Sequence, residues 1–144
     1  MSYNIFICGI GGQGVITLGK IIAEATLKDG KNVTLGENRG HAKRNDSVSC
    51  HIRIGKTYSP MIPKHDADLI IALNQEELKR HKEMINKNTK IIHKTKEEFL
   101  KTSDELKNYN IFLLREAIKG KDFPISKENI EEAINEKINK TRRE

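Results

Sequence analysis

The spacing of hydrophobic positions changes along the chain and predicts an alternation of strands and helices. Residues 3–8 form an apolar run typical of a buried strand, and residues 14–29 repeat apolar side chains at three- and four-residue steps, as an amphipathic helix does. Gly30 follows where a C-terminal helix cap belongs. Residues 33–35 predict a short second strand, so we expect a β-α-β unit with a right-handed crossover and parallel strands.

A strictly alternating segment comes next, after a polar, glycine-containing loop. Residues 47–54 place an apolar side chain at every second position, which is the period of a strand with two different faces. The other face carries Ser47, Ser49, His51 and Arg53. Gly55 and Lys56 suggest a tight turn, so we expect residues 57–59 to return as the second strand of a β-hairpin.

The second half of the chain continues the alternation. Residues 67–73 predict a strand with a continuous apolar run, as in the centre of a parallel sheet, and residues 75–85 predict an amphipathic helix. Ser126 is the expected N-cap of the last helix, with Ile125 and Ile130 placed to form a hydrophobic staple. The remaining expected elements are a strand at 89–93 and helices at 96–107, at 111–119 and from 127 to about Lys140.

Length and element order define the expected fold class. With 144 residues there is room for one domain, over residues 1–144, that buries a real core. The order of strands and helices predicts an α/β three-layer sandwich with a Rossmann-like, mostly parallel sheet and an inserted β-hairpin. No apolar run reaches transmembrane length, and the first residues lack the basic region of a signal peptide, so we expect a cytoplasmic protein without a membrane partner.

Net charge and cysteine content exclude only a few classes of function. Much of the net charge of +6 comes from lysines interleaved with glutamates in the second half, which is typical of a solvated helix face. The charges alternate in sign and no nucleic-acid motif appears, so no nucleic-acid partner is expected. Cys8 and Cys50 lie in apolar runs and are too few for an iron–sulfur cluster, which takes four ligands, so we interpret both as buried thiols and expect no metal site.

The segment GIGGQG, residues 9–14, stands between the first strand and the first helix and satisfies the pattern G-x-G-x-x-G. In dinucleotide-binding folds these glycines allow a tight turn and the close approach of a pyrophosphate, and the helix N-terminus behind them attracts anions. Glu37 lies 23 residues after Gly14, about where a dinucleotide-binding acid is expected. The candidate contact residues of this turn are Gly9, Gly11, Gly12, Gln13 and Gly14.

Three interpretations of this turn stay open. It can contact a phosphate or another anion, it can be a tight turn without a ligand, or it can belong to a stand-alone NAD- or FAD-binding module. The third is disfavoured because a dinucleotide fold continues with a crossover helix and a third parallel strand after its acid. Here a loop and the alternating segment follow Glu37 instead.

Basic residues crowd around the alternating segment. Guanidinium groups bind phosphates and carboxylates through two parallel hydrogen bonds, so this region can hold an oxyanion or an acidic partner, although an ordinary solvated sheet face is the alternative. The candidate contact residues here are Arg39, His41, Arg44, His51 and Arg53. No set of nucleophile, base and orienting residue can be read from the spacing, so we assign no catalytic residue and do not expect a complete enzyme from this chain alone.

Three segments in combination carry a family resemblance. NIFICGIGGQGVITLGKIIAEA contains a G-x-G-G-Q-G turn, and RGHAKRNDSVSCHIRIG contains an arginine-bearing loop followed by the strand Cys50-His51-Ile52-Arg53. YSPMIPKHDADLIIAL contains Ser-Pro, Ile-Pro and Ala-Asp pairs. Together these segments, over about residues 3–75, resemble the gamma subunit of 2-oxoacid:ferredoxin oxidoreductases, closest to the small subunit of the indolepyruvate and ketoisovalerate type, and the closing helices are similar as well.

The resemblance implies a subunit of a hetero-oligomer that oxidatively decarboxylates a 2-oxoacid, such as pyruvate, ketoisovalerate or indolepyruvate, to an acyl-CoA. It implies that thiamine diphosphate and iron–sulfur clusters reside on the catalytic partner subunits, and that this chain packs against them, serves the coenzyme A side and meets ferredoxin only indirectly. Family members usually carry Gly-Gly where Arg44 is followed here by Asn45-Asp46, and this chain is shorter after residue 95. A divergent paralogue with a binding or regulatory role therefore also stays open.

Overall fold

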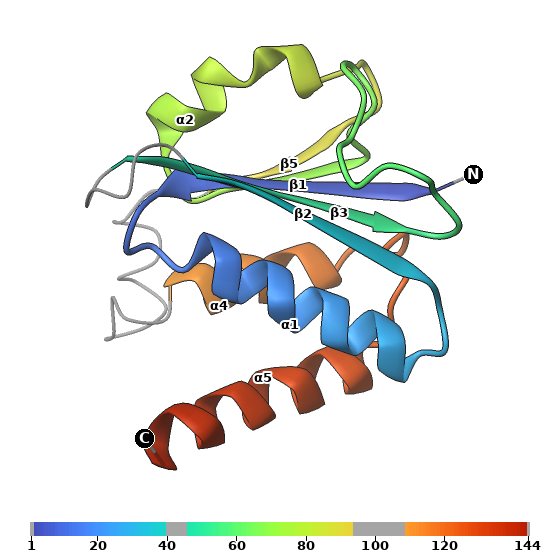
Figure 1. Ribbon diagram of the computed structural model, residues 1–144, viewed down its shortest axis with the longest axis vertical. Helices are drawn as coiled ribbons and strands as arrows, with labels where there is room; N and C mark the ends of the chain where they lie inside the picture. The colour runs from blue at the N-terminus through green and yellow to red at the C-terminus, as the bar shows by residue number, and fades with distance from the viewer. Residues whose placement is uncertain (1, 40–45, 94–108, 144) are drawn as a thin grey trace.

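The computed structural model describes residues 2–39, 46–93 and 109–143, which form one sheet with helices on both faces (Figure 1). One face is covered by α1 (Val15–Lys28), α4 (Tyr109–Ile118) and α5 (Lys127–Arg143). The other carries α2 (Gln75–Arg80) and the short 3-10 helix η1 (Lys82–Met84). The predicted three-layer α/β sandwich is confirmed. Within the described ranges, no helix combines the length and apolar character needed to cross a membrane.

The sheet has the strand order β2-β3-β1-β4-β5. Its strands are β1 (Tyr3–Ile10), β2 (Val33–Arg39), β3 (Ser47–Ile54), β4 (Leu69–Ala72) and β5 (Lys90–Ile92). β4 pairs in parallel with β1 and with β5, whereas β3 is antiparallel to both of its neighbours, β1 and β2. Among the described strands, β3 therefore runs against the direction that the others share, and the predicted mostly parallel sheet is confirmed.

β1 and β2 run in the same direction, as predicted, but they are not neighbours. β3 lies between them, because Ile52 pairs with Ile5 on one side and with Leu35 on the other. β2 is also longer than the predicted residues 33–35. Its neighbour in the sheet is the next strand of the chain, and pairing consecutive strands requires the closure of only a short loop, which costs little entropy.

The β-hairpin is therefore built from β2 and β3, and the predicted return strand at 57–59 is wrong. The segment after β3 crosses the sheet face as a loop. The guanidinium of Arg53 donates hydrogen bonds to the carbonyl oxygens of Ser59 and Met61, at 3.1 and 3.4 Å. Pro60 between them has no N–H for a sheet ladder, which favours a covering loop over a strand at this position.

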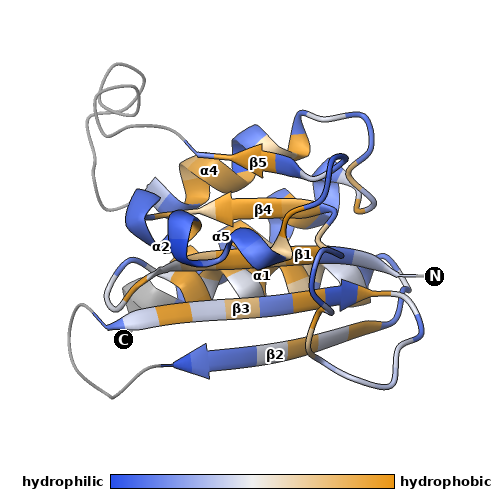
Figure 2. Cartoon of the chain, turned by 90° about the horizontal axis from the view of Figure 1, so that it is seen from above, coloured by the Kyte–Doolittle hydropathy of each residue, from blue (hydrophilic) through white to orange (hydrophobic). Residues whose placement is uncertain are grey.

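The core is divided by the sheet. The larger cluster, beneath α1, α4 and α5, includes Ile5, Ile7 and Cys50, whereas Phe6 and Cys8 belong to a smaller cluster on the α2 face. Figure 2 shows how the apolar residues concentrate in β1, β4 and β5. The two cysteines are free and buried on opposite faces, which confirms the interpretation as buried thiols, and burial raises the pKa of each thiol to about 12.

The later elements follow the predicted order with changed bounds. The helix predicted at 75–85 is interrupted, since α2 ends at Arg80 and η1 follows it. Ser126 caps α5 as predicted, because its hydroxyl oxygen accepts a hydrogen bond from the N–H of Asn129 at 3.2 Å. Ile125 and Ile130 are both buried in the same core cluster, as the predicted staple requires. The helix predicted at 96–107 lies outside the described residues.

Candidate functional site

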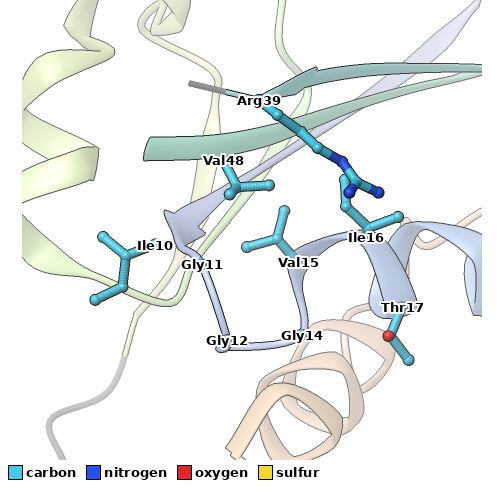
Figure 3. Close-up of a pocket in the computed structure, with 9 residues that line it drawn as sticks. All are labelled: Ile10, Gly11, Gly12, Gly14, Val15, Ile16, Thr17, Arg39 and Val48. Carbon is cyan, nitrogen blue, oxygen red and sulfur yellow. The ribbon is translucent and has the colours of Figure 1, made fainter. Parts of the chain in front are cut away.

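The glycine turn lies at the carboxyl-terminal end of β1, the end of a parallel sheet at which α/β proteins bind their ligands. A cavity of about 360 Å³ opens beside it, and Figure 3 labels the residues that line it. Gly11, Gly12 and Gly14 form one side of the cavity, and Arg39 and Val48 reach it from β2 and β3. The fold thus brings the turn together with one of the predicted basic residues, Arg39.

Each glycine of the turn occupies its position for a different structural reason. Gly14 has φ +86° and its absent side chain leaves room for Asn110, whose amide nitrogen donates to the Gly14 carbonyl oxygen at 3.2 Å. Gly12 has φ +89°, but an added Cβ would meet nothing within 4 Å. The N–H of Gly11 donates to the carbonyl oxygen of Asp46 at 2.9 Å, which ties the turn to the start of β3. Gly12 is therefore the position at which the turn faces open space.

Gln13 shapes the turn from within. Its side-chain oxygen accepts a hydrogen bond from the N–H of Ile10 at 2.8 Å, and its side-chain nitrogen donates to the carbonyl oxygen of Leu73 at 2.9 Å. The amide therefore bridges the end of β1 to the residue after β4. This contact spans 60 positions in the sequence. The sequence motif of the turn therefore could not have predicted this hydrogen bond.

Gln13→Glu should destabilise the fold by about 2 kcal/mol, because a carboxylate oxygen would face the Leu73 carbonyl where an N–H donor now lies. Gln13→Ala should cost about 1 kcal/mol, since the site is only half-buried and water can reach the two abandoned groups. Urea denaturation of the two variants beside the parent chain measures both losses. A Gln13→Glu variant as stable as the parent would contradict the bridging role.

The first turn of α1 is left open toward the cavity. Gly14 is its N-cap residue and supplies no side-chain cap, so the first N–H groups of the helix are available to a ligand. The Arg39 side chain is 62% exposed and lies 3.5 Å from the carboxylate of Glu37. Ile10, Val48 and Ile16 add apolar walls. This combination of N–H groups, a guanidinium and apolar walls suits an anion carried on a larger group, and it offers binding rather than bond-breaking chemistry.

The strand order removes the geometric basis of the dinucleotide interpretation. In a dinucleotide fold the acidic residue ends a strand that is adjacent to the first strand. Here β3 separates β2 from β1, so Glu37 is displaced by the width of one strand. Its carboxylate is already paired with Arg39.

Two other predicted basic residues, His51 and Arg53, are not at the cavity. His51 and Arg53 point to the opposite face of the sheet, where His51 is 5% exposed and its Nδ1 accepts a hydrogen bond from the N–H of Ile62 at 3.0 Å. Its ring also meets Phe6 edge to face at 5.0 Å. The polar face predicted for β3 is therefore covered over its inner part rather than exposed to solvent. His41 and Arg44 lie outside the described residues.

The chain is similar in sequence to known proteins. The family described as pyruvate ferredoxin/flavodoxin oxidoreductase matches residues 4–134. The chain is 44% identical over 96 residues to indolepyruvate oxidoreductase subunit IorB of Archaeoglobus fulgidus, and 41% identical over 95 residues to the subunit of the same name from Methanothermobacter thermautotrophicus. These matches cover 67% and 66% of this chain, and the chain spans only 48% of the length of each relative.

Two solved structures share the fold. The keto/oxoacid ferredoxin oxidoreductase gamma subunit from Geobacter sulfurreducens superposes with a TM-score of 0.69 and 24% identity, covering 92% of this chain and 84% of that one. A 2-oxoglutarate:ferredoxin oxidoreductase from Magnetococcus marinus, solved with 2-oxoglutarate, coenzyme A and succinyl-CoA bound, gives a TM-score of 0.77 and 18% identity. That match covers 97% of this chain and 27% of the larger chain.

Proposed function

The chain belongs to the pyruvate ferredoxin/flavodoxin oxidoreductase family, and from this premise we propose that it is the gamma-type subunit of a cytoplasmic 2-oxoacid:ferredoxin oxidoreductase. Such an enzyme decarboxylates a 2-oxoacid oxidatively, transfers the acyl group to coenzyme A and passes the electrons to ferredoxin. The observation that carries the proposal is the extent of the family match, which runs from β1 into α5. It includes the whole sheet rather than the glycine turn alone.

In this proposal the redox groups belong to the catalytic partner subunits, with which this chain forms a hetero-oligomer. Thiamine diphosphate there supplies the carbanion chemistry, and iron–sulfur clusters carry the electrons to ferredoxin. The described residues of this chain do not fit a cluster, because Cys8 and Cys50 are buried on opposite faces of the sheet. Cluster ligation needs four ligands that meet at one point.

The role of this chain is then to assemble with the catalytic subunits and to serve the coenzyme A side. The open N–H groups of α1 and the exposed guanidinium of Arg39 suit a phosphate group, and the apolar walls suit the rest of such a ligand. Indolepyruvate is the first 2-oxoacid to test, because the two IorB relatives described above carry it in their names. Pyruvate, ketoisovalerate and 2-oxoglutarate complete the series.

Arg39→Ala should raise the KM for coenzyme A about tenfold in the reconstituted complex, which is the loss of one hydrogen bond to a charged group. The stability of the chain should not change, since the Arg39 side chain is largely exposed. Arg115→Ala is the matched control, because Arg115 is also an exposed arginine paired with a glutamate, Glu131, but it lies on α4. Steady-state acyl-CoA formation measures both variants.

The two parts of the proposal fail separately. An unchanged KM for coenzyme A in the Arg39→Ala complex would contradict the coenzyme A contact at the cavity. An enzyme that assembles and turns over at the same rate without this chain would contradict the subunit role itself.

A further inference from the structure

β2 is an edge strand of the sheet that the described residues form. No other strand of the described residues pairs with it beyond β3, and Figure 2 shows it at the border of the sheet. Edge strands with free backbone groups are templates for pairing with another chain. β2 is seven residues long, so its outer side can form several backbone hydrogen bonds with another strand.

The register determines which backbone groups point outward. The N–H of Gly55 donates to the carbonyl oxygen of Asn32 at 2.9 Å, and the same register pairs Gly36 with His51. Because alternate residues of an antiparallel strand bond to the same neighbour, the even-numbered residues of β2 face β3. The backbone groups that point outward are those of Val33, Leu35, Glu37 and Arg39.

A stripe of α1 runs alongside this edge. At one end Thr17 shares the cavity at the glycine turn with Arg39. At the other end Leu27, 63% exposed, lines a cavity of about 460 Å³ with the start of β2. Lys20 and Glu24 lie between them on the same helical face and are exposed. Figure 1 shows α1 and β2 on the same side of the molecule.

The stripe and the strand are both self-complementary. None of the ion pairs among the described residues involves Lys20 or Glu24. When two copies of α1 meet antiparallel, positions 20 and 24 exchange partners, so that each lysine faces a glutamate of the other copy. The same operation places Leu27 against the Thr17 end of the second helix. An isologous interface has this property, because one patch must complement itself.

We propose that two copies of this chain associate about a two-fold axis through Gly36, perpendicular to the sheet, joining β2 to β2 and α1 to α1. This register uses the full strand, with Val33 opposite Arg39 of the second copy and Leu35 opposite Glu37. The two Gly36 residues form the central, non-hydrogen-bonded pair, in which Cα atoms approach to about 4.5 Å. The sheets of the two copies become continuous, and both α1 helices lie on one face. The inference concerns self-association and does not depend on the proposed enzymatic role.

Sedimentation equilibrium of the purified 144-residue chain tests this dimer. The expected mass is twice the 16.4 kDa of one chain at concentrations of about 10–100 µM. Lys20→Glu and Glu24→Lys should each weaken the dimer about tenfold or more, because each single change places like charges opposite one another at two symmetric positions. The double variant Lys20→Glu with Glu24→Lys should restore the parental association, since the charges are exchanged but again complementary.

Two further variants keep the test specific. Lys140→Glu changes the net charge equally on α5, away from the edge, and should leave the dimer intact. Glu37→Pro removes an outward N–H and should abolish pairing, because proline is tolerated at sheet edges but cannot donate to a ladder. Circular dichroism checks that each variant is folded. A monomeric parent chain, single charge variants that associate as tightly as the parent, or a double variant that fails to recover would each overturn the proposal.

Discussion

Gly14→Ala is expected to reduce the free energy of unfolding by about 3 kcal/mol, whereas Gly12→Ala should reduce it by only about 1 kcal/mol. Both glycines have nearly the same left-handed φ, +86° and +89°, so both substitutions carry the same backbone penalty. An added Cβ at Gly14 would clash with the Asn110 side chain, while one at Gly12 would meet open space. The difference between the two losses therefore isolates the packing of the turn against α4.

Urea denaturation of the two variants measures this difference. Adding Asn110→Ala to the Gly14→Ala chain should recover part of the loss, because it removes the group that the new methyl meets. Equal losses in Gly12→Ala and Gly14→Ala would contradict this account of the turn. Gly12→Ala has a second use, since it keeps the fold and extends a methyl group toward the cavity, so a change in ligand binding there cannot be attributed to unfolding.

The second large effect is a loss of folding stability at acid pH, which we attribute to His51. Burial, together with smaller electrostatic contributions from His81 and Arg53, lowers the pKa of His51 to about 4 from its ordinary value of 6.5. The folded chain therefore holds the neutral imidazole, and the unfolded chain takes up the proton first as the pH falls. The stabilisation is fully present above pH 6.5 and decreases toward pH 4, by about 3 kcal/mol over that window.

Denaturation midpoints measured from pH 7.5 down to pH 4 test the His51 prediction. His51→Gln is the informative variant, because it cannot titrate and should flatten the slope of stability against pH below 6.5. The variant will be less stable at neutral pH, since the N–H of Ile62 then depends on a poorer acceptor. A parent chain and a His51→Gln variant with the same acid slope would contradict the assignment to His51.

The sequence predicted the elements better than their arrangement. Period-two alternation over 47–54 identified β3, because a strand with two different faces leaves that signature in any sheet. Which strand lies beside β3 depends on tertiary contacts, and the alternation contains no information on them. Residues 57–59 were wrongly predicted as a return strand, because the local pattern does not reveal the hydrogen bonds from Arg53 that hold this segment as a loop.

In the candidate site, too, the sequence predicted the local turn but not the contacts around it. The pattern G-x-G-x-x-G correctly placed a strand-to-helix turn, because the positive φ of Gly14, its last glycine, favours glycine. Gly12 also has a positive φ, but it occupies a variable position of the pattern. It could not distinguish a dinucleotide fold from the present one, since the motif specifies a turn and not the order of the strands. Asn110 supports that turn from 96 positions away, and no spacing rule connects the two. His51 looked like a surface ligand because burial by a distant loop cannot be read from a polar position in a strand.

Affinity capture of this chain from an extract of its native cells, followed by mass spectrometry and by thiamine diphosphate and iron analysis, tests the central claim most directly. The account predicts that subunits carrying thiamine diphosphate and iron–sulfur clusters are recovered with this chain in near-equal amounts. Recovery of this chain without such subunits, under conditions in which they are present and intact in the extract, would contradict it.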